Sequence, residues 1–497
     1  MTGLSILIAI LLPTIGGALL PLLDFRVRKV REYYVMAIVI AASVFAVSIA
    51  MNSQGTQFVL YHLTSTIDIA FRVDRFGGVF VLLVSILWPL ATLYAFEYMR
   101  PFHKRNKFFG FFTMSFGITL GVAFSANLIT MYLFYEMLTL VTLPLITHEG
   151  TREAKVAGVK YLVYSIGGAT AAFIGIIMVL THGGSLEFSV IGLGKAATQQ
   201  TRALFDAAFM FMFFGFGVKA AIAPLHGWLP TAGVAPTPVT ALLHAVAVVK
   251  TGVFAIGRVA YFTYDAGYLA GSVVQKVALM FAACTILYGS AMAWKEMHFK
   301  KRLAYSTVSN LSYIVFAFML MTPEGLSAGL LHMVFHGLIK ITLFFVAGAV
   351  IHQTGRIYVT DLRGFGRRMP VSFAVFTIAS LSLVGTPPFC GFLSKFAIAD
   401  AAAAEGSKPA YFGIAALLVS AVFTAAYLLT IVIRAYFPAK DFDYKTIADV
   451  KDPSMYMLLP FIILAALIIL LGLFPGALQD FIRAAQPEAF PMLRLQL

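Results

Sequence analysis

The sequence has few charged residues and almost no cysteine, and each scarcity excludes a class of protein. Only 12% of its 497 residues are charged, whereas 60% are hydrophobic, and the mean hydropathy is +0.89. A soluble domain is about a quarter charged, so this composition excludes a soluble globular protein. The two cysteines, Cys284 and Cys390, form no CxxC pair. That excludes a disulfide scaffold, a zinc ribbon or a cysteine-ligated cluster within the chain.

Long apolar runs take up most of the chain. Many of them approach the ~20 residues that cross a bilayer, and they predict an all-α polytopic membrane protein with about fourteen transmembrane helices. The predicted spans are 2–22, 33–52, 75–99, 108–124, 128–148, 156–180, 204–224, 238–262, 271–294, 303–321, 327–352, 371–400, 411–436 and 455–475. The opening run has no basic region before it, so we expect a first span there and not a cleaved signal.

The distribution of Lys and Arg among the loops explains the net charge of +14. Loops after odd-numbered spans hold 23 of these residues, and the loops on the opposite side hold 8. Basic loops face the cytoplasm, so both termini are expected outside, in a cell (inner or plasma) membrane. Because topology accounts for the basicity, no nucleic-acid partner is expected.

Ionisable side chains inside the predicted spans are the candidate functional residues. They are Glu136, Lys219, Lys250, Arg258, Lys340 and Lys395. A charge at a helix centre costs roughly 2.5–3.5 kcal/mol on insertion scales. Lys219 and Lys395 lie nearer to span ends, where a lysine can also reach water by snorkelling. Arg258 is expected to be structural, at the end of its span.

The seventh and twelfth spans each carry a lysine beside a helix break. In the seventh, Pro224 and further prolines follow Lys219; in the twelfth, Gly385 and Pro387 precede Lys395. Proline removes a backbone donor and interrupts a helix, and such breaks occur in a membrane only inside protein or beside a polar cavity. Paired interrupted spans, one in each half of the chain, indicate an ion path between repeats.

The span count predicts two inverted five-helix repeats. Spans four to eight and nine to thirteen form two sets of five, and an odd number of spans per set turns the second set over. We expect an N-terminal three-helix segment at 1–107, the repeats at 108–262 and 263–436, and a C-terminal helix with an interfacial tail at 437–497.

The stretch "LHMVFHGLIK" places His332, His336 and Lys340 four residues apart, on one face of a helix. Histidine can pass on a proton at physiological pH, and burial disfavours the charged forms of lysine and glutamate. With Glu136, Lys219, Lys250, His244 and Lys395, this stripe predicts a proton wire across the plane of the membrane.

The two histidines of this stripe could also serve other functions. A zinc site would lack a third ligand and the glutamate of metalloproteases, and haem ligation needs histidines facing each other from two helices. Histidines that only pack, bonded to nearby backbone, stay an open alternative, although Lys340 on the same face favours the wire. We therefore expect no metal and no cofactor in this chain.

Several motifs, in order along the chain, resemble a known family. They include "NLITMYLFYEMLTL", "VKAAIAPLHGWLPTAGVAPTPVTALLHAVAVVKTG", "HMVFHGLIKITLFFVAGAV" and "GTPPFCGFLSKF". The family is that of the antiporter-like proton-pumping subunits of respiratory complex I (NADH-quinone oxidoreductase), membrane-bound hydrogenases and Mrp-type cation/proton antiporters. The resemblance runs from about Asp74 to Lys395. It implies a fourteen-helix fold with inverted repeats and no redox cofactor, with energy supplied by partner subunits.

The resemblance also implies roles for single residues. Glu136 and Lys219 would form the coupling pair, and Lys250, with His244 nearby, would match the eighth-span residue of the family. Lys340 would be the central lysine and Lys395 the terminal one. Several features depart from the family. The loop "HGWLPTAGVAPTP" is shorter than usual and lacks the Asp and second His often found there, and Lys395 stands where one branch has Glu.

The expected function is proton translocation by a subunit of a multi-subunit membrane complex, driven by a redox module of the complex I or hydrogenase kind. Any enzyme activity would belong to that complex, since this chain has no redox centre. The alternative is an Mrp-type Na+/H+ antiporter subunit driven by ion gradients. An unrelated solute carrier is disfavoured by the charged axis. Lys160 is a second possible partner for Glu136, and the tail from Gly476 is expected to touch a neighbouring subunit.

Overall fold

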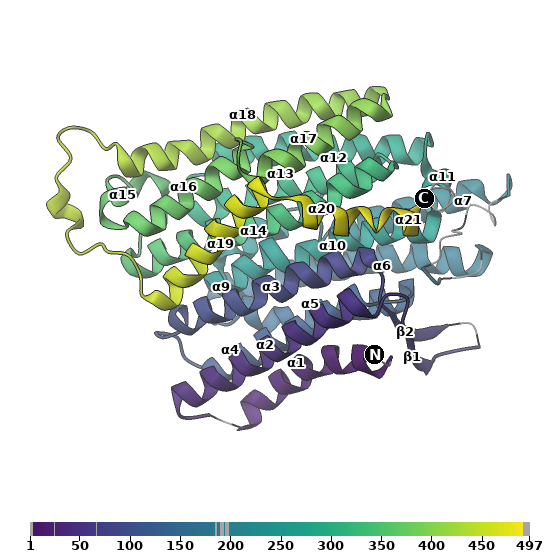
Figure 1. The fold of residues 1–497 in the computed structure, drawn as a ribbon, viewed down its shortest axis with the longest axis horizontal. Helices are drawn as coiled ribbons and strands as arrows, with labels where there is room; N and C mark the ends of the chain where they lie inside the picture. Colours follow the sequence, from purple (N-terminus) through teal and green to yellow (C-terminus); the bar gives the residue numbers. More distant parts are fainter. Residues whose placement is uncertain are drawn as a thin grey trace.

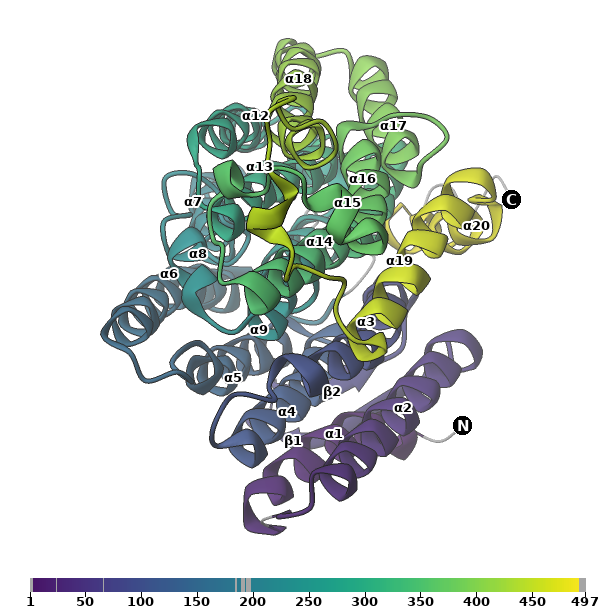
Figure 2. The same ribbon diagram turned by 90° about the vertical axis from the view of Figure 1, so that its left-hand side faces the viewer.

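Long helices packed side by side along nearly one direction make up the structure, a computed structural model (Figures 1 and 2). It describes residues 3–23, 25–65, 67–183, 186–188, 193 and 198–490. The longer helices are α1 (Leu4–Leu23), α2 (Arg28–Asn52), α3 (Arg75–Tyr98), α4 (Arg105–Ala123), α5 (Leu128–Ile146), α6 (Arg152–Gly183), α7 (Arg202–Gly217), α10 (Val248–Arg258), α12 (Val273–Lys295), α13 (Phe299–Met319), α14 (Pro323–Thr354), α16 (Pro370–Val384), α17 (Cys390–Glu405), α18 (Lys408–Tyr436) and α19 (Met455–Leu473).

Short elements connect and extend these helices. They are α8 (Trp228–Thr231), η2 (Ala232–Val234), α9 (Thr237–Ala241), the π-helical η3 (Leu242–Val246) and η4 (Val259–Tyr264), α11 (Ala266–Leu269), η5 (Val359–Asp361), α15 (Phe365–Arg368), η6 (Tyr444–Ile447), α20 (Gly476–Arg483) and α21 (Gln486–Ala489). Two strands, β1 (Gln57–His62) and β2 (Asp68–Arg72), complete the fold.

Each predicted span coincides with a helix or with a helix in pieces, which confirms the predicted membrane architecture. Ten helices of the described residues are long and apolar enough to cross a membrane. The eighth predicted span is a chain of α9, η3, α10 and η4, and the twelfth is divided into α16 and α17. The predicted seventh span, 204–224, is too long, because α7 already ends at Gly217.

Between the second and third spans lies a feature that the sequence did not predict. Residues there form an antiparallel hairpin in which Phe58 pairs with Phe71 and Val59 with Ala70. Aromatic and β-branched residues such as these favour strands, but the segment lies between two strong membrane spans, where a loop is the simplest expectation. The hairpin extends from one end of the helical bundle (Figure 1).

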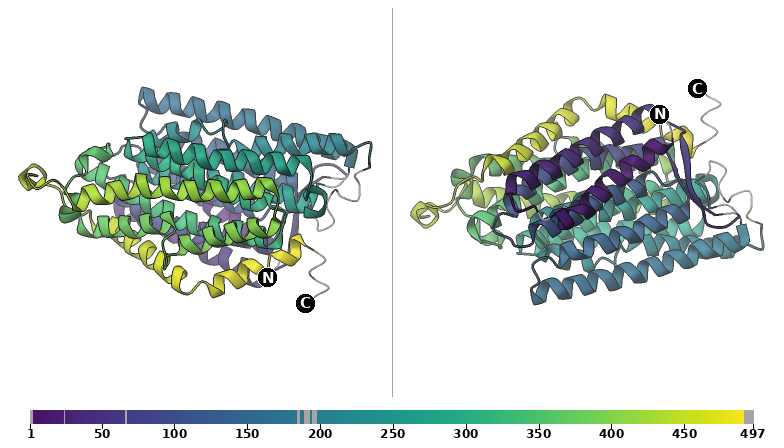
Figure 3. Two further views of the ribbon diagram at one scale, coloured as in Figure 1. Left: turned by 90° about the horizontal axis from the view of Figure 1, so that it is seen from above. Right: turned by 90° about the horizontal axis from the view of Figure 1, so that it is seen from below.

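The two ends of the bundle carry different segments. The connections at 99–104 and 437–454 lie at one end, which we call the basic-loop end (left in Figure 1). The hairpin β1–β2 and both ends of the chain lie at the other, which we call the hairpin end. Figure 3 shows α6 along an outer edge of the bundle, where Val156, Val159 and Val163 are exposed. Apolar side chains exposed at this edge fit contact with lipid.

Helix α14 is the centre of the bundle (Figure 2). It packs against α3, α13, α16, α17 and α19, and 94% of its most apolar stretch is buried inside the protein. Its first turn is fixed by the N-cap Thr322, whose hydroxyl accepts a hydrogen bond from the Gly325 amide at 3.0 Å. The polar side chains in this stretch, among them His332, His336 and Lys340, therefore face protein and not lipid.

The last described helices pack on their own chain. Helix α20 contacts α3 and α14, and the Gln486 amide donates hydrogen bonds to the Pro323 carbonyl and the Ser327 hydroxyl, each at 2.9 Å. The predicted contact of this tail with a neighbouring subunit stays a prediction, and residues 491–497 lie outside the described part of the chain.

A buried ion pair joins α3 to α10. The Arg258 guanidinium donates to the Asp74 carboxylate at 2.7 Å, and the same carboxylate caps α3 by accepting from the Gly77 amide at 2.7 Å. The rings of Phe76, Phe188, Phe254 and Phe262 surround the guanidinium at 4.9–5.1 Å. Burial of both partners agrees with the structural role expected for Arg258.

Replacing Asp74 with alanine is expected to destabilise the fold by about 3–5 kcal/mol, because the guanidinium of Arg258 would stay buried without its carboxylate. Thermal unfolding of the detergent-solubilised chain measures this change. Asp68→Ala is the matched control, since the Asp68 carboxylate pairs with His62 on the hairpin, where His62 is exposed. Equal losses of stability in both variants would contradict the assigned role.

Candidate functional site

Glu136 and Lys219 are brought together, as the sequence predicts. The Lys219 ammonium lies 3.8 Å from a Glu136 carboxylate oxygen, and it donates a hydrogen bond to the backbone carbonyl of Tyr135. It also lies 3.4 Å from the centre of the Tyr135 ring. The lysine side chain is fully buried, whereas the Glu136 side chain is 26% exposed. At this distance the pair is an ion contact and not a hydrogen bond.

Lys219 lies in the break itself and not in a helix. After α7 ends at Gly217, Ala221 takes a positive φ of 58°, and the Trp228 indole donates to the Val218 carbonyl at 2.7 Å. Helix α10 approaches this loop at Gly252, where a side chain would overlap the backbone at Lys219 and Ala220. A glycine is therefore required for the close packing that positions the lysine.

Lys250 of α10 and His336 of α14 are in direct hydrogen-bonding contact. The Lys250 Nζ lies 2.6 Å from His336 Nδ1, and both side chains are fully buried. A hydrogen bond needs one donor and one acceptor, so a lysine ammonium requires an unprotonated Nδ1, and a protonated Nδ1 requires a neutral amine. The contact therefore holds one shared proton between the two nitrogens.

His332, on the same helix as His336, contacts α17. Its ring lies 5.9 Å from that of His336, and its Nδ1 lies 2.9 Å from the Ser394 hydroxyl. On its other side the His332 ring stacks on Tyr313 at 5.3 Å, and the Lys395 ammonium lies 5.2 Å from the same tyrosine ring. Tyr313 and Ser394 therefore stand between the histidine and Lys395.

Lys395 and Lys340 are both held by backbone carbonyls. The Lys395 ammonium donates to the carbonyls of Leu383 at 2.5 Å and Val384 at 3.3 Å, the last carbonyls of α16. The Lys340 ammonium donates to the Leu303 carbonyl at 2.8 Å and to the Ser306 hydroxyl at 2.6 Å, both on α13. Helix ends leave such carbonyls without intrahelical partners, so the break after α16 supplies the acceptors for Lys395.

His244 lies in the π-helical turn η3, a feature that the sequence did not predict. Its side chain is fully buried, and neither ring nitrogen has a hydrogen-bond partner in the described structure. The ring packs on Phe344 at 4.9 Å, and the Lys340 ammonium lies 5.9 Å from the centre of the same ring. π-helical turns inside α-helices occur frequently at functional sites.

We call Glu136, Lys219, Lys250, His336, His332, Lys340, His244 and Lys395 the buried row, and electrostatic interactions join its members from Lys250 onward. Lys340 interacts with Lys250 and with His244, and His332 interacts with both Lys395 and Lys250. The row has one gap: between described residues, no hydrogen bond or ion pair joins Lys219 to Lys250. Their segments meet only through the backbone of Lys219 and Gly252.

Three polar contacts of the site were missed by sequence reasoning. Ser306 and Ser394 supply hydroxyls to the row, and the periodicity of apolar residues gives no signal for them. Lys300, counted among the loop residues, is buried in the first turn of α13, with its ammonium 2.9 Å from the Ala235 carbonyl. Lys160, the proposed second partner of Glu136, instead donates to the Thr231 hydroxyl at 3.1 Å.

The side chains present give no grouping suited to a metal ion. Among the residues that the structure describes, no three His, Cys, Asp or Glu side chains are close enough together to hold one. The ring Nδ1 atoms of His332 and His336 face Ser394 and Lys250 instead.

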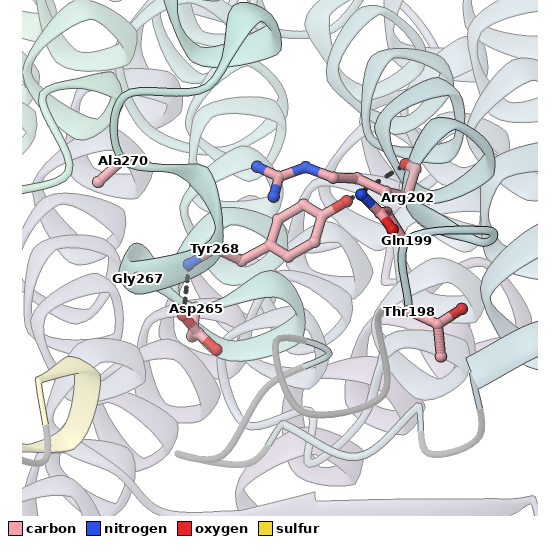
Figure 4. A pocket seen from close by; sticks show the side chains of 7 residues that line it. All are labelled: Thr198, Gln199, Arg202, Asp265, Gly267, Tyr268 and Ala270. Atoms are coloured by element: carbon pink, nitrogen blue, oxygen red, sulfur yellow. Dashed lines mark hydrogen bonds between the residues drawn. The ribbon is translucent and has the colours of Figure 1, made fainter.

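Two of the cavities in the described part of the chain lie at the ends of the bundle. One of about 600 Å³ lies between α6, the broken segment and α13, lined by Lys160, Thr231, Lys301 and Tyr305 among others. The other, of about 510 Å³, lies at the start of α7 near α11 (Figure 4), where the Tyr268 hydroxyl bonds to Asp206 at 2.9 Å. The first adjoins the segment that carries Lys219, whereas none of the predicted site residues lines the second.

Residues 125–424 match the family model described as NADH:quinone oxidoreductase/Mrp antiporter, TM. The Na(+)/H(+) antiporter subunit A1 of Staphylococcus haemolyticus is 30% identical over 503 residues, covering 96% of this chain and 62% of that protein. The chain thus spans less than two thirds of that relative. The NADH-quinone oxidoreductase subunit N of Desulforudis audaxviator is 32% identical over 367 residues, which cover 73% of this chain and 72% of that protein.

A solved structure has the same fold over nearly the whole chain. It is a chain of the membrane-bound sulfane sulfur reductase, an archaeal respiratory membrane complex, with a TM-score of 0.86 and 25% sequence identity. The likeness covers 97% of each chain. Together with the family match, it confirms the predicted polytopic membrane fold and the predicted resemblance.

Substituting alanine at Gly252 is expected to displace the loop that carries Lys219 and to lower stability by about 1–3 kcal/mol, because the new methyl group would overlap backbone atoms. The melting temperature of the solubilised chain measures the effect. Gly233→Ala is the matched control, since an added Cβ there would meet nothing within 4 Å. If the two variants melt alike, Gly252 does not set the position of the break.

Proposed function

Because the chain belongs to the NADH:quinone oxidoreductase/Mrp antiporter transmembrane family, we propose that it translocates protons along the buried row as a subunit of a multi-subunit membrane complex. The observation that carries this proposal is the contact between Lys250 and His336, where two fully buried bases share one proton. Because the shared proton can lie on either base, such a pair is suited to passing it on.

The proposed sequence begins at the coupling pair. With Lys219 close to Glu136, the two charges stabilise each other. When Lys219 moves away from the Glu136 carboxylate, its ammonium loses that stabilisation. The electrostatic field at the other residues of the row then changes. The proton shared by Lys250 and His336 then shifts, and Lys340, His332 and Lys395 follow in turn, each responding to the charge of its neighbour.

The row also has a proposed orientation and repeat structure. We place the basic-loop end in the cytoplasm and both termini outside a cell membrane, since basic loops are retained in the cytoplasm. We propose inverted repeats at 108–262 and 263–436, flanked by 1–107 and 437–497. Helix α7 enters from the hairpin end and α16 from the basic-loop end, and each is interrupted beside a lysine (Figure 1), which supports an inversion.

Two sources of energy fit this site. A redox module of the complex I or hydrogenase kind is our first proposal, and the likeness to a chain of an archaeal respiratory complex over 97% of both chains supports it. An Mrp-type Na+/H+ exchange driven by ion gradients is the second, supported by the likeness to an Na(+)/H(+) antiporter subunit over 96% of this chain. The same buried residues carry the protons whether a redox module or an ion gradient supplies the energy.

Glu136→Ala and Lys219→Ala are each expected to lower proton movement by about 100-fold or more while the complex still assembles, because each removes one partner of the coupling pair. Proton movement into membrane vesicles, followed with a pH-sensitive dye, measures the effect. Lys276→Ala removes an exposed lysine at the start of α12 and should leave proton movement unchanged. Full proton movement in either coupling variant would overturn this mechanism.

Purification of the intact assembly in mild detergent, followed by mass spectrometry of its subunits, should return iron–sulfur or hydrogenase-like subunits if a redox module drives the row. Small membrane proteins alone would instead assign the gradient-driven function. Proton movement that needs Na+ in the vesicles would support the gradient-driven function by an independent measurement.

A further inference from the structure

Lys300 has a burial and a set of partners that the row described above does not use. It lies in the first turn of α13, and its side chain is buried, whereas the neighbouring Lys301 is half-buried and lines the cavity beside α6. A lysine that only contributes to a basic loop would keep its ammonium in water. The Lys300 ammonium instead points inward and donates to the Ala235 carbonyl at 2.9 Å.

The Ala235 carbonyl also links Lys300 to the helical turn that precedes His244. The Thr240 hydroxyl donates to the same Ala235 oxygen at 2.9 Å, and Thr240 lies four residues, about one helical turn, before His244. The His244 ring interacts electrostatically with Lys300 and with Lys340. It is fully buried and neither ring nitrogen is bonded in the described structure, so one nitrogen can take up a proton while the other releases one.

On the opposite side, Lys300 faces the aqueous end. Glu149 follows the end of α5 at the basic-loop end, is exposed, and interacts electrostatically with Lys300. Partial burial raises the pKa of the Glu149 carboxyl, and the Lys300 charge opposes that rise. Deeper along α13, Leu303 and Ser306 hold the Lys340 ammonium at 2.8 and 2.6 Å. Lys300 thus lies between an exposed acid and the central lysine of the row.

We propose that Lys300, supplied by Glu149, is the entrance through which protons pass between the aqueous phase at the basic-loop end and the row, by way of His244 to Lys340. This inference rests on the proposed function. It adds an access point and two residues, Glu149 and Lys300, that the row itself does not include.

The transfer balances in protons and charge. The Lys300 ammonium gives one proton to a neutral ring nitrogen of His244, which leaves a neutral amine and an imidazolium. The imidazolium releases the proton on its other nitrogen to the neutral amine of Lys340. The Lys300 amine then takes a proton from the Glu149 carboxyl, and the carboxylate takes up one proton from the aqueous phase. One proton has moved inward, and the His244 ring, now protonated on its other nitrogen, returns to its first tautomer before the next transfer.

The test compares Lys300→Met and Lys300→Arg in the intact assembly, with proton movement into vesicles followed by the dye pyranine. Methionine removes the ammonium. Arginine keeps the charge and can donate to the Ala235 carbonyl, but it does not give up its proton in proteins. Both variants are expected to lower proton movement by about 100-fold, and Lys300→Arg is expected to assemble normally. Lys301→Met is the matched control and should keep normal proton movement.

Three results would overturn the inference. Proton movement restored in Lys300→Arg would show that the lysine only clamps the broken segment to α13, and normal movement in Lys300→Met would show that it is not needed. An equal loss in Lys301→Met would indicate a general effect of basic charge. If the Lys300→Met variant fails to assemble, the Lys300→Arg variant alone tests the inference, because arginine keeps the hydrogen bond to the Ala235 carbonyl.

A Lys340→Met variant separates this inference from the proposed function. If Lys340→Met abolishes proton movement and Lys300→Met does not, the row functions and only the entrance at Lys300 is wrong. If Lys340→Met moves protons normally, the proposed function itself fails. Glu149→Gln should lower proton movement less than Lys300→Met, because water can reach Lys300 from the same end once the acid is removed.

Discussion

The hydrogen bond between Lys250 and His336 is the interaction on which the rest of the site depends. It joins α10 to α14 at a depth where neither side chain reaches solvent. Two bases at 2.6 Å cannot both be protonated on the facing nitrogens, so the contact is stable only while it holds a single proton. The surrounding helices keep this contact away from water and fix its position. Helix α14 is enclosed by other helices, and the π-helical turns η3 and η4 flank α10, the helix that carries Lys250.

Backbone carbonyls, and not carboxylates, hold most of the buried lysines. Lys340, Lys395 and Lys300 each donate to a carbonyl oxygen at 2.5–2.9 Å. A lysine paired with a buried carboxylate would be fixed in its charged form, because losing the proton would leave an unpaired buried anion. A carbonyl accepts from an ammonium or from a neutral amine. Among the described residues, Lys219 is the buried lysine with a carboxylate oxygen within ion-pair distance, and that contact is long, at 3.8 Å.

Helix breaks supply the acceptors of Lys395 and Lys300, whereas the Leu303 carbonyl that holds Lys340 lies within α13. Where α16 stops at Val384, its last carbonyls have no intrahelical partner, and Lys395 occupies two of them. The loop after α7 likewise places the carbonyl of Ala235 within reach of Lys300. The sequence could predict such breaks from proline and glycine, and it could predict the stripe of His332, His336 and Lys340 from spacing. It could not predict that α7 ends before its prolines, that His244 lies in a π-helical turn, or that Lys300 is buried. Those features depend on packing between segments far apart in the chain, such as the approach of Gly252 to the Lys219 backbone.

The spacing of the row is matched to the work that translocation requires. Two unit charges about 6 Å apart in a medium of effective dielectric constant about 20 interact by about 3 kcal/mol. The rings of His332 and His336 are 5.9 Å apart, and the ammonium of Lys395 is 5.2 Å from the tyrosine ring against which His332 stacks. Moving one charge through 100 mV costs roughly 2.3 kcal/mol. In the proposed mechanism, a change of charge at one position is therefore comparable with the work of moving one proton against a membrane potential of this size. Neighbours at such spacings would carry the effect from Lys250 to Lys395 without any large motion of the helices.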